Sequence, residues 1–182
     1  YGHSSLARFV LLPDKLYFFS PGGSVIAYTA RGGVALALGD PIGPPEDITE
    51  AIVAFQQFCQ RNDWSPTFYQ TLPDYRDLYR AAGFELLCIG HEGIVPLEIF
   101  TVSGGANKNL RATTNRFTRA GYQAIVHEPP LSTALLAELR RVSDEWLTMM
   151  HGSEQRFSLG WFDDDYISHS RVMAIHRPDG AI

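Results

Sequence analysis

Cysteine is scarce in this sequence: its 182 residues include two, Cys59 and Cys88, and both have apolar neighbours. No Cys-x-x-Cys pair, His-Glu-x-x-His pair or local cluster of histidine and cysteine is present, so nothing signals a metal site. We therefore expect two buried free thiols, an intracellular setting, no disulfide, no metal and no cofactor.

Long apolar runs are also lacking. None approaches the roughly 20 residues that a membrane-spanning helix needs, and no secretory signal peptide is visible. The composition, 45% hydrophobic, is nevertheless sufficient for a folded core. Residues 171–182 predict a strand, a Pro-Asp-Gly turn and the first residues of a returning strand. We therefore expect more sheet to follow, with this chain being part of a longer protein.

Acidic residues are missing from one stretch, 108–121, although the net charge of the whole chain is −5. In a helix, its four cations and one asparagine would occupy a sector about 140° wide, with Leu110 and Phe117 opposite and able to face a core. This polar sector consists of Lys108, Arg111, Asn115, Arg116 and Arg119. No acid lies three or four residues away to form the usual surface pairs. The pattern predicts a phosphate-binding face; a merely solvated face is the alternative.

Alternating apolar residues predict two hairpins at the start of the chain, followed by a mixture of helices and strands. The predicted strands are 7–12, 16–20, 25–30, 34–38, 64–71, 84–89 and 122–127. The predicted helices begin near Asp47, Pro73, residue 106, Ser132 and Asp163. A strand–helix–strand order implies a crossover and at least one parallel pair.

This order of elements is that of an α/β (α+β) acetyltransferase-like, GNAT-type mixed sheet with flanking helices. The glycine-rich loop by which such folds bind the pyrophosphate of acetyl-CoA is missing, and Gly104-Gly105 does not replace it. The pattern therefore favours the architecture without favouring acetyl-CoA as the donor.

Four ordered blocks resemble one family. They read FFSPGGSVIAYTARGGVALALGDPIGPPED, KNLRATTNRFTRAGY, PPLSTALLAELRRVSDEWL and RFSLGWFDDDYI. Together they resemble the C-terminal domain of phosphatidylglycerol lysyltransferases, also called multiple peptide resistance factors or aminoacyl-phosphatidylglycerol synthases. The resemblance implies two tandem acetyltransferase-like folds: a first fold over 1–128, a connecting helical region over 129–170, and the start of a second fold over 171–182.

The same resemblance implies an enzyme that moves an aminoacyl group, lysyl in the first instance, from aminoacyl-tRNA to phosphatidylglycerol. This reaction changes the charge of membrane lipid and confers resistance to cationic peptides. Its implied setting is the cytoplasmic face of the bacterial membrane, next to an N-terminal transmembrane region, with self-association as a further expected contact. The chain would supply only part of the active unit.

The resemblance also selects candidate residues outside the basic stretch. Asp144 and Glu145 would orient a cationic amine or act in catalysis, and Glu92 matches an acidic family position; solvent-facing carboxylates are the alternative. Ser158 and Gly160, in a turn that could offer backbone N–H groups to an anion, and Asp40, after a predicted strand, would contribute to substrate binding. A plain connecting loop and a capped turn are the alternatives there.

Two other functions remain open at this point. A Fem-type peptidoglycan aminoacyltransferase shares the twin fold and the tRNA donor. A non-catalytic module could instead present the basic helix to anionic lipid or RNA, with binding that depends strongly on salt.

Overall fold

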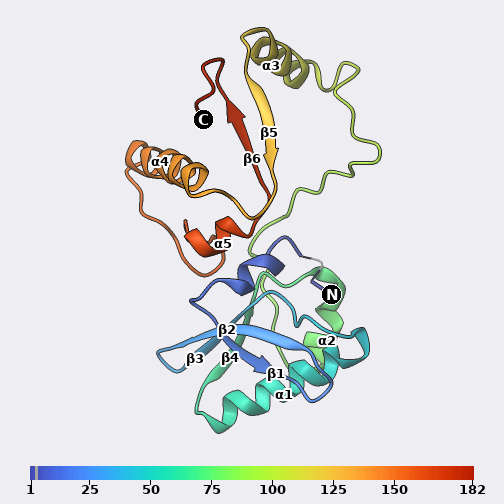
Figure 1. Ribbon diagram of the computed structural model, residues 1–182. Helices are drawn as coiled ribbons and strands as arrows, with labels where there is room; N and C mark the ends of the chain where they lie inside the picture. The colour runs from blue at the N-terminus through green and yellow to red at the C-terminus, as the bar shows by residue number, and fades with distance from the viewer. Residues whose placement is uncertain (3) are drawn as a thin grey trace. The chain divides into compact units, whose positions relative to one another are not determined.

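The computed structural model describes residues 1–2 and 4–182, and the chain forms two compact units (Figure 1). Unit 1 comprises Tyr1–Gly90 and Glu154–Trp161, and unit 2 comprises His91–Ser153 and Phe162–Ile182. These units do not follow the boundaries at 128 and 170 suggested by the sequence. Those boundaries concern tandem folds of a longer protein and stay a prediction.

A four-stranded mixed sheet forms the centre of unit 1. Its order is β1-β2-β3-β4, with two antiparallel pairings followed by a parallel one. The strand bounds are Leu16–Phe19 (β1), Val25–Arg31 (β2), Val34–Leu38 (β3) and Ser65–Tyr69 (β4). Helix α1 (Ile48–Arg61) supplies the crossover between the parallel strands β3 and β4.

Helix α1 packs on the sheet through apolar residues spaced three and four apart. The ring of Phe55, which is fully buried, lies 5.5 Å from Phe18, 5.3 Å from Tyr28 and 5.5 Å from Phe68. These edge-to-face contacts connect the helix to β1, β2 and β4. The main core of unit 1 therefore lies between α1 and the sheet.

Helix α1 begins after a short 3₁₀ turn, η2 (Pro45–Asp47), as the sequence predicts, but the Asp47 side chain does not cap it. Asp47 Oδ2 instead accepts hydrogen bonds from Ser20 Oγ and, at 2.9 Å, from Ser24 N. These bonds, above all the one from Ser20, hold the pKa of Asp47 below its ordinary value. The carboxylate thus fastens the β1–β2 turn to the start of α1. A Cβ at Gly22 would collide with it.

The opposite face of the sheet is covered by η1 (Ala7–Leu11), a 3₁₀ helix where the sequence predicts a strand. Its turns are closed by local bonds such as Leu12 N to Phe9 O, at 3.2 Å. Val10 packs there with Ala27 and Leu38. A short apolar run is compatible with either a strand or a buried turn, and here packing against the sheet favours the turn.

Unit 1 continues with η3 (Pro73–Tyr75) and α2 (Arg76–Ala81), as predicted, but the strand predicted at 84–89 does not form. Phe84 packs against Phe68 and Tyr79, with ring centroids 5.4 and 5.9 Å away. Beyond it Leu87 is 85% exposed, and no ladder hydrogen bonds hold the segment to the described sheet. Cys59 is buried as expected, whereas Cys88 is exposed, contrary to expectation.

Unit 2 is built around a two-stranded antiparallel ribbon of β5 (Gln123–His127) and β6 (Val172–His176). Its helices are α3 (Lys108–Arg119), α4 (Thr133–Met149) and α5 (Asp164–Ser168). Ser132 caps α4, as predicted, by accepting a hydrogen bond from Leu135 N at 3.3 Å. None of the three helices contains a buried residue.

The chain ends in the predicted turn after β6. Gly180 N donates to Arg177 O at 2.9 Å, and Arg177 N donates to Ala181 O at 2.8 Å. Gly180 has a φ of 87°, a backbone conformation that favours glycine. The returning strand expected after this turn is not formed by residues 181–182.

Candidate functional site

Helix α3 carries the predicted basic face. It contains no acid, and Lys108, Asn115, Arg116 and Arg119 are all exposed. Within the described chain none of these four makes a hydrogen bond or ion pair through its side chain; the Arg116 guanidinium only lies 5.2 Å from the ring of neighbouring Phe117. Three cations therefore remain available to an external anion.

Arg111, in the same sector, is positioned differently. Its Nη1 donates to the backbone carbonyls of Val102 at 2.7 Å and Gly104 at 2.9 Å. Asn107 Nδ2 donates to Thr101 O at 2.6 Å. Arg111 thus anchors the loop before α3, and we assign it a structural contribution in addition to its charge.

The apolar side of α3 does not face a core. Leu110 is 46% exposed and Phe117 is 42% exposed, although the Phe117 ring meets Tyr122 edge-on at 5.1 Å. The expectation that these residues pack into an interior is wrong for the described chain. The contact with Tyr122 lies at the junction between α3 and β5.

Asp144 and Glu145 lie beside a shallow hollow on α4. Arg140, Arg141 and Thr148 also line it. Glu145 Oε1 pairs with Arg141 Nη1 at 2.7 Å, across one helical turn. The Asp144 carboxylate is exposed and has no hydrogen bond or ion pair in the part of the chain that the structure describes. Of the two predicted acids, Asp144 is therefore the one free to meet an external cation.

Arg140 also lines this hollow. Its Nη2 pairs with Asp164 of α5 at 2.8 Å, and its guanidinium lies 4.5 Å from the centroid of the Phe162 ring. These contacts, which connect α4 to α5, restrict the side chain. The hollow is therefore lined by a cation held in place and by a free carboxylate, groups suited to an amino acid with its carbonyl and ammonium groups.

The loop with Ser158 and Gly160 belongs to unit 1, although its neighbours in sequence belong to unit 2. Asp14 Oδ2 accepts a hydrogen bond from Phe157 N at 3.0 Å. The Phe157 ring lies 5.2 Å from the Lys15 ammonium and 6.1 Å from the Tyr69 ring. These contacts clamp the loop onto the face of the sheet that η1 covers.

Phe157 has a φ of 70°, an uncommon value for a residue with a side chain, which costs of order 1–3 kcal/mol. Gly160, at φ 71°, lies close to Leu12 and Phe9. Ser158 between them is half-buried. Asp14 and Lys15 hold the loop in this strained conformation. They form an ion pair in which the Lys15 side chain is fully buried. Sequence reasoning missed this pair; an adjacent acid and base after Pro13 was its only signal.

Asp40 has a structural position. Its Oδ2 accepts from Leu72 N at 2.9 Å and its Oδ1 from Tyr79 Oη at 3.0 Å. Burial raises the pKa of Asp40 above its ordinary value, in spite of both hydrogen bonds. The carboxylate thus joins the end of β3 to η3 and α2 inside unit 1. Glu92 lies in unit 2, in the exposed segment between α2 and α3 that has no helix or strand.

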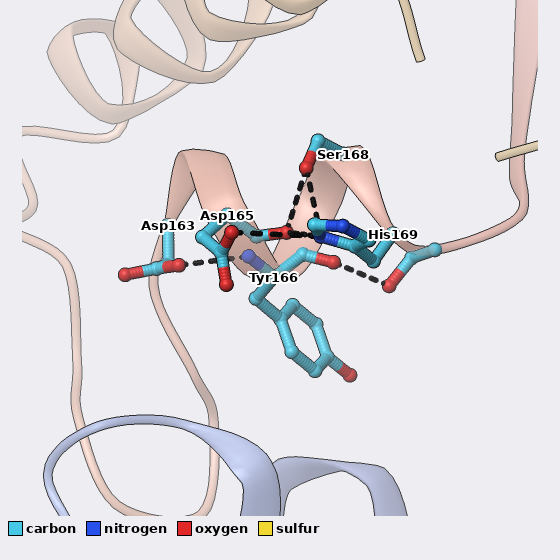
Figure 2. Close-up of polar contacts among 6 residues, drawn as sticks. Asp163, Asp165, Tyr166, Ser168 and His169 are labelled. Atoms are coloured by element: carbon cyan, nitrogen blue, oxygen red, sulfur yellow. Dashed lines mark hydrogen bonds and ion pairs between the residues drawn. The ribbon is translucent and has the colours of Figure 1, made fainter. Parts of the chain in front are cut away.

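Helix α5 brings together serine, histidine and aspartate, but not as a catalytic triad (Figure 2). Ser168 Oγ donates to Asp165 O at 2.8 Å, and His169 Nδ1 lies 2.8 Å from the same carbonyl. Asp163 Oδ1 accepts from Tyr166 N at 2.8 Å, which caps the helix. Ser168 Oγ also lies 3.1 Å from His169 Nδ1, but that nitrogen must carry a hydrogen to bond the Asp165 carbonyl and so cannot accept the serine proton. The cluster therefore closes a short helix.

The predicted site residues therefore fall into separate groups. The α3 face and the α4 hollow belong to unit 2, and no hydrogen bond or ion pair between described residues joins these two helices. Asp40 and the Phe157–Gly160 loop belong to unit 1. The groups differ in character: exposed cations on α3, an exposed carboxylate at Asp144, and a strained loop held by Asp14 and Lys15.

Solved structures of two other proteins share this fold. The structure of L-PGS from Bacillus licheniformis matches with a TM-score of 0.93 at 35% identity, over 98% of this chain and 56% of that one. The C-terminal domain of a lysylphosphatidylglycerol synthetase from Agrobacterium fabrum matches with a TM-score of 0.91 at 32% identity, again over 98% and 56%. The predicted acetyltransferase-like mixed α/β fold is thereby confirmed.

The family model described as "Phosphatidylglycerol lysyltransferase, C-terminal" matches residues 1–182, and the chain belongs to this family. The phosphatidylglycerol lysyltransferase of Bacillus subtilis is 34% identical over 182 residues, which is all of this chain and 21% of that protein. The enzyme of the same name from Staphylococcus xylosus is 32% identical over 173 residues, 94% of this chain and 20% of that protein. The chain thus spans about a fifth of these curated relatives.

None of the helices in residues 1–2 and 4–182 is both long enough and apolar enough to cross a bilayer.

Proposed function

We propose that this chain is part of an aminoacyltransferase that moves a lysyl group from lysyl-tRNA to phosphatidylglycerol. The observation that carries the proposal is the set of cations on α3, Lys108, Arg116 and Arg119, which have no acidic partner in the described chain. Both substrates present phosphate, and arginine can hold a phosphate through two parallel hydrogen bonds. Membership of the family supports the same reaction.

The chemistry is the exchange of one ester for another. A glycerol hydroxyl of the lipid attacks the carbonyl carbon of the aminoacyl ester and loses its proton to a base. The tetrahedral oxyanion then collapses, and the tRNA 3′-terminal oxygen departs with a proton. Because the tRNA ester is already activated, the protein has mainly to position the two reactants. This donor needs no coenzyme A, in keeping with the missing pyrophosphate loop.

Three groups of this chain suit separate parts of that task. The α3 face would hold a phosphodiester at the surface. Asp144, beside the α4 hollow, would hold the α-ammonium or side-chain ammonium of the lysyl group. Ser158 and Gly160 would present the backbone of the loop to the substrates. Glu145 contributes through its pair with Arg141, and no residue is assigned as the base.

The chain spans about a fifth of its curated relatives, so the proposal concerns a larger active unit. In that unit residues 1–128 and 129–170 would form the first acetyltransferase-like fold and its connection, with a second fold following. The working location would be the cytoplasmic face of the bacterial membrane, and the partners would be aminoacyl-tRNA and phosphatidylglycerol, with self-association as a further contact.

The α3 face is tested by binding to vesicles of phosphatidylglycerol and phosphatidylcholine over a salt series. Each cation near an anionic surface contributes about 1 kcal/mol, so removing two should weaken binding by about 2 kcal/mol, roughly 30-fold. Arg116→Glu with Arg119→Glu should show at least this loss and a shallower salt dependence.

The matched control is Arg76→Glu with Arg80→Glu on α2, where both side chains are exposed. Either double variant changes the net charge by four, from −5 to −9. Equal losses in both would show that only net charge matters and would contradict a binding role for α3. A separate tRNA titration distinguishes the two phosphate sources.

Activity is tested by transfer of labelled lysine from lysyl-tRNA into phosphatidylglycerol vesicles. Residues 1–182 are compared with the same residues extended through the expected second fold. Labelled lipid from the extended protein, lost in the Arg116→Glu, Arg119→Glu variant, supports the proposal. No labelled lipid from either folded protein, with intact tRNA, would overturn it.

A further inference from the structure

Two histidines meet across the β5–β6 ribbon of unit 2. His127 ends β5 and His176 ends β6, 49 positions apart in sequence, and their Nε2 atoms are 3.0 Å apart. In the register of the ribbon Gln123 lies opposite His176, and His127 is four residues beyond Gln123. Because side chains alternate along a strand, both imidazoles stand on the same face.

The ribbon leaves room for this approach. Between the two histidines on that face lies the pair Ile125 and Ala174, and the alanine side chain is a single methyl group. The imidazoles converge along the ribbon until their ring centroids are 5.3 Å apart. The two histidines face different partners, Val172 and Gln123, at opposite ends of the ribbon, so their side chains must extend toward each other along it to bring the Nε2 atoms together.

A second contact decides which nitrogen of His176 carries its proton. His176 Nδ1 lies 3.0 Å from Gly180 O. A carbonyl can only accept a hydrogen bond, so Nδ1 carries the hydrogen and Nε2 of the neutral ring has a lone pair. His127 Nε2 therefore supplies the hydrogen between the rings. A histidine whose other nitrogen donates to a backbone carbonyl is oriented as metal-binding histidines are.

We propose that His127 and His176 form a binding site for a divalent transition-metal ion. When the ion enters, it takes the place of the single hydrogen between the rings. The proton on His127 Nε2 leaves and one is bound at Nδ1, so the neutral pair releases no net proton. Both Nε2 lone pairs then point at the metal, and His176 keeps its hydrogen bond to Gly180.

The separation of the two nitrogens selects the kind of ion. With metal–nitrogen bonds of about 2.05 Å, a 3.0 Å separation corresponds to an angle at the metal of about 95°. That is close to the angle between neighbouring ligands in tetragonal Cu²⁺ and Ni²⁺ sites, and a small opening suits tetrahedral Zn²⁺. Mg²⁺ and Ca²⁺, which require oxygen ligands, do not fit.

The surroundings leave the site open. No group of three or more histidine, cysteine, aspartate and glutamate side chains among the described residues is arranged around a metal position, so water would complete the coordination. The neighbouring cations are already neutralised: Arg171 pairs with Glu128 at 2.9 Å and Arg177 with Asp179 at 3.6 Å. A bound ion would clip β5 to β6 and to the turn at Gly180.

The experiment is a calorimetric titration of the untagged chain with NiCl₂, ZnCl₂ and MgCl₂ at pH 7.5. We expect one equivalent of Ni²⁺ or Zn²⁺ to bind and Mg²⁺ not to bind. His127→Ala and His176→Ala should each weaken binding by about tenfold or more, equal to about 1.4 kcal/mol. His169→Ala, which removes an exposed histidine directly after α5, is the matched control and should leave binding unchanged.

A second measurement guards against misfolding of the variants. In the unaltered chain, the nitrogen NMR signals of His127 and His176 should shift together on adding Zn²⁺, and the β5–β6 amides should exchange more slowly with solvent. Binding that survives in a His127→Ala, His176→Ala double variant would overturn the site, as would no uptake at all or shifts confined to other histidines. None of these readouts depends on aminoacyl transfer.

Discussion

The two units of this protein use their polar side chains in opposite ways. In unit 1, Asp40, Asp47 and Asp14 each bind backbone N–H groups and fasten one element to another. In unit 2, Lys108, Arg116 and Arg119 of α3 and Asp144 of α4 are exposed and have no polar partner in the described chain. These carboxylates of unit 1 hold elements of the fold together, whereas these exposed charges of unit 2 remain available to ligands.

The two units also differ in how deeply their apolar residues are buried. Unit 1 has a closed aromatic core around Phe55, but no helix of unit 2 has a buried residue. A charge can be left unpaired at low cost only where water reaches it. The open construction of unit 2 is therefore what allows the cations of α3 and the Asp144 carboxylate to stay unpaired. Substitutions in unit 1 should mainly change stability, and those on the polar faces of unit 2 should mainly change binding.

The largest expected effect is that of Phe55→Ala. Removing a fully buried ring that contacts three strands should cost about 3–5 kcal/mol in the free energy of unfolding. The matched variant, Phe117→Ala, removes a ring that is 42% exposed and should cost less than about 1 kcal/mol. Urea denaturation measures both. Equal losses would show that unit 2 has as tight a core as unit 1.

A slightly smaller loss is expected from Asp14→Ala. It leaves the buried Lys15 ammonium without its partner and Phe157 N without its acceptor, which should cost about 3 kcal/mol. Amide hydrogen exchange should rise across 154–161. Asp14→Asn with Lys15→Met, which removes both charges, should recover part of the loss. Asp179→Ala, which removes an exposed carboxylate of unit 2, serves as the control, and comparable exchange in both variants would disprove the clamp.

Sequence periodicity was enough to predict α1, the β2–β3 hairpin, α3 and α4, because each follows from its own apolar spacing or capping residue. It was wrong at 7–11 and at 84–89, where short apolar runs suit several structures and tertiary packing decides. The basic face was predictable because α3 is one continuous helix. The contacts by which Arg111 anchors the preceding loop were not predictable, because the sequence does not show which groups an arginine side chain will bind.

Contacts between distant segments could not be predicted at all. Asp14 meets Phe157 across 143 positions, and His127 meets His176 across 49. Neither pair has a spacing that a pattern could reveal. Nor could the sequence show that Asp40 is held by Tyr79, because that contact depends on how α2 packs against the end of β3.

Acid should weaken unit 1 through Asp47. The folded state lowers the pKa of this carboxyl below its ordinary value of 3.8, so its contribution is fully present above that pH. The contribution is lost as the pH falls from about 4 through the folded pKa. Asp47→Asn should therefore flatten the loss of stability below about pH 4, measured by urea denaturation at several pH values.

Asp40 should change the stability of unit 1 in acid in the opposite direction. Its folded pKa is raised, so its charged form opposes folding, and protonation relieves this cost as the pH falls through the folded pKa. Asp40→Asn should thus steepen the acid dependence that Asp47→Asn flattens. The same direction of change in both variants would contradict the assignment of the two environments.

The smallest change in stability is expected for Glu145→Gln. Together with Asp144→Asn, it tests whether the exposed charges of unit 2 contribute to binding and not to stability. The ion pair of Glu145 with Arg141 is exposed on both sides, so its loss should cost only about 0.3–0.5 kcal/mol. Asp144→Asn should cost no more, since that carboxylate has no polar partner in the described chain. In aminoacyl transfer, however, Asp144→Asn should raise the KM for lysyl-tRNA, whereas Glu145→Gln should change it little. A larger effect from Glu145→Gln would assign the amine to the paired carboxylate, and the free charges of unit 2 would then no longer mark its ligand-binding groups.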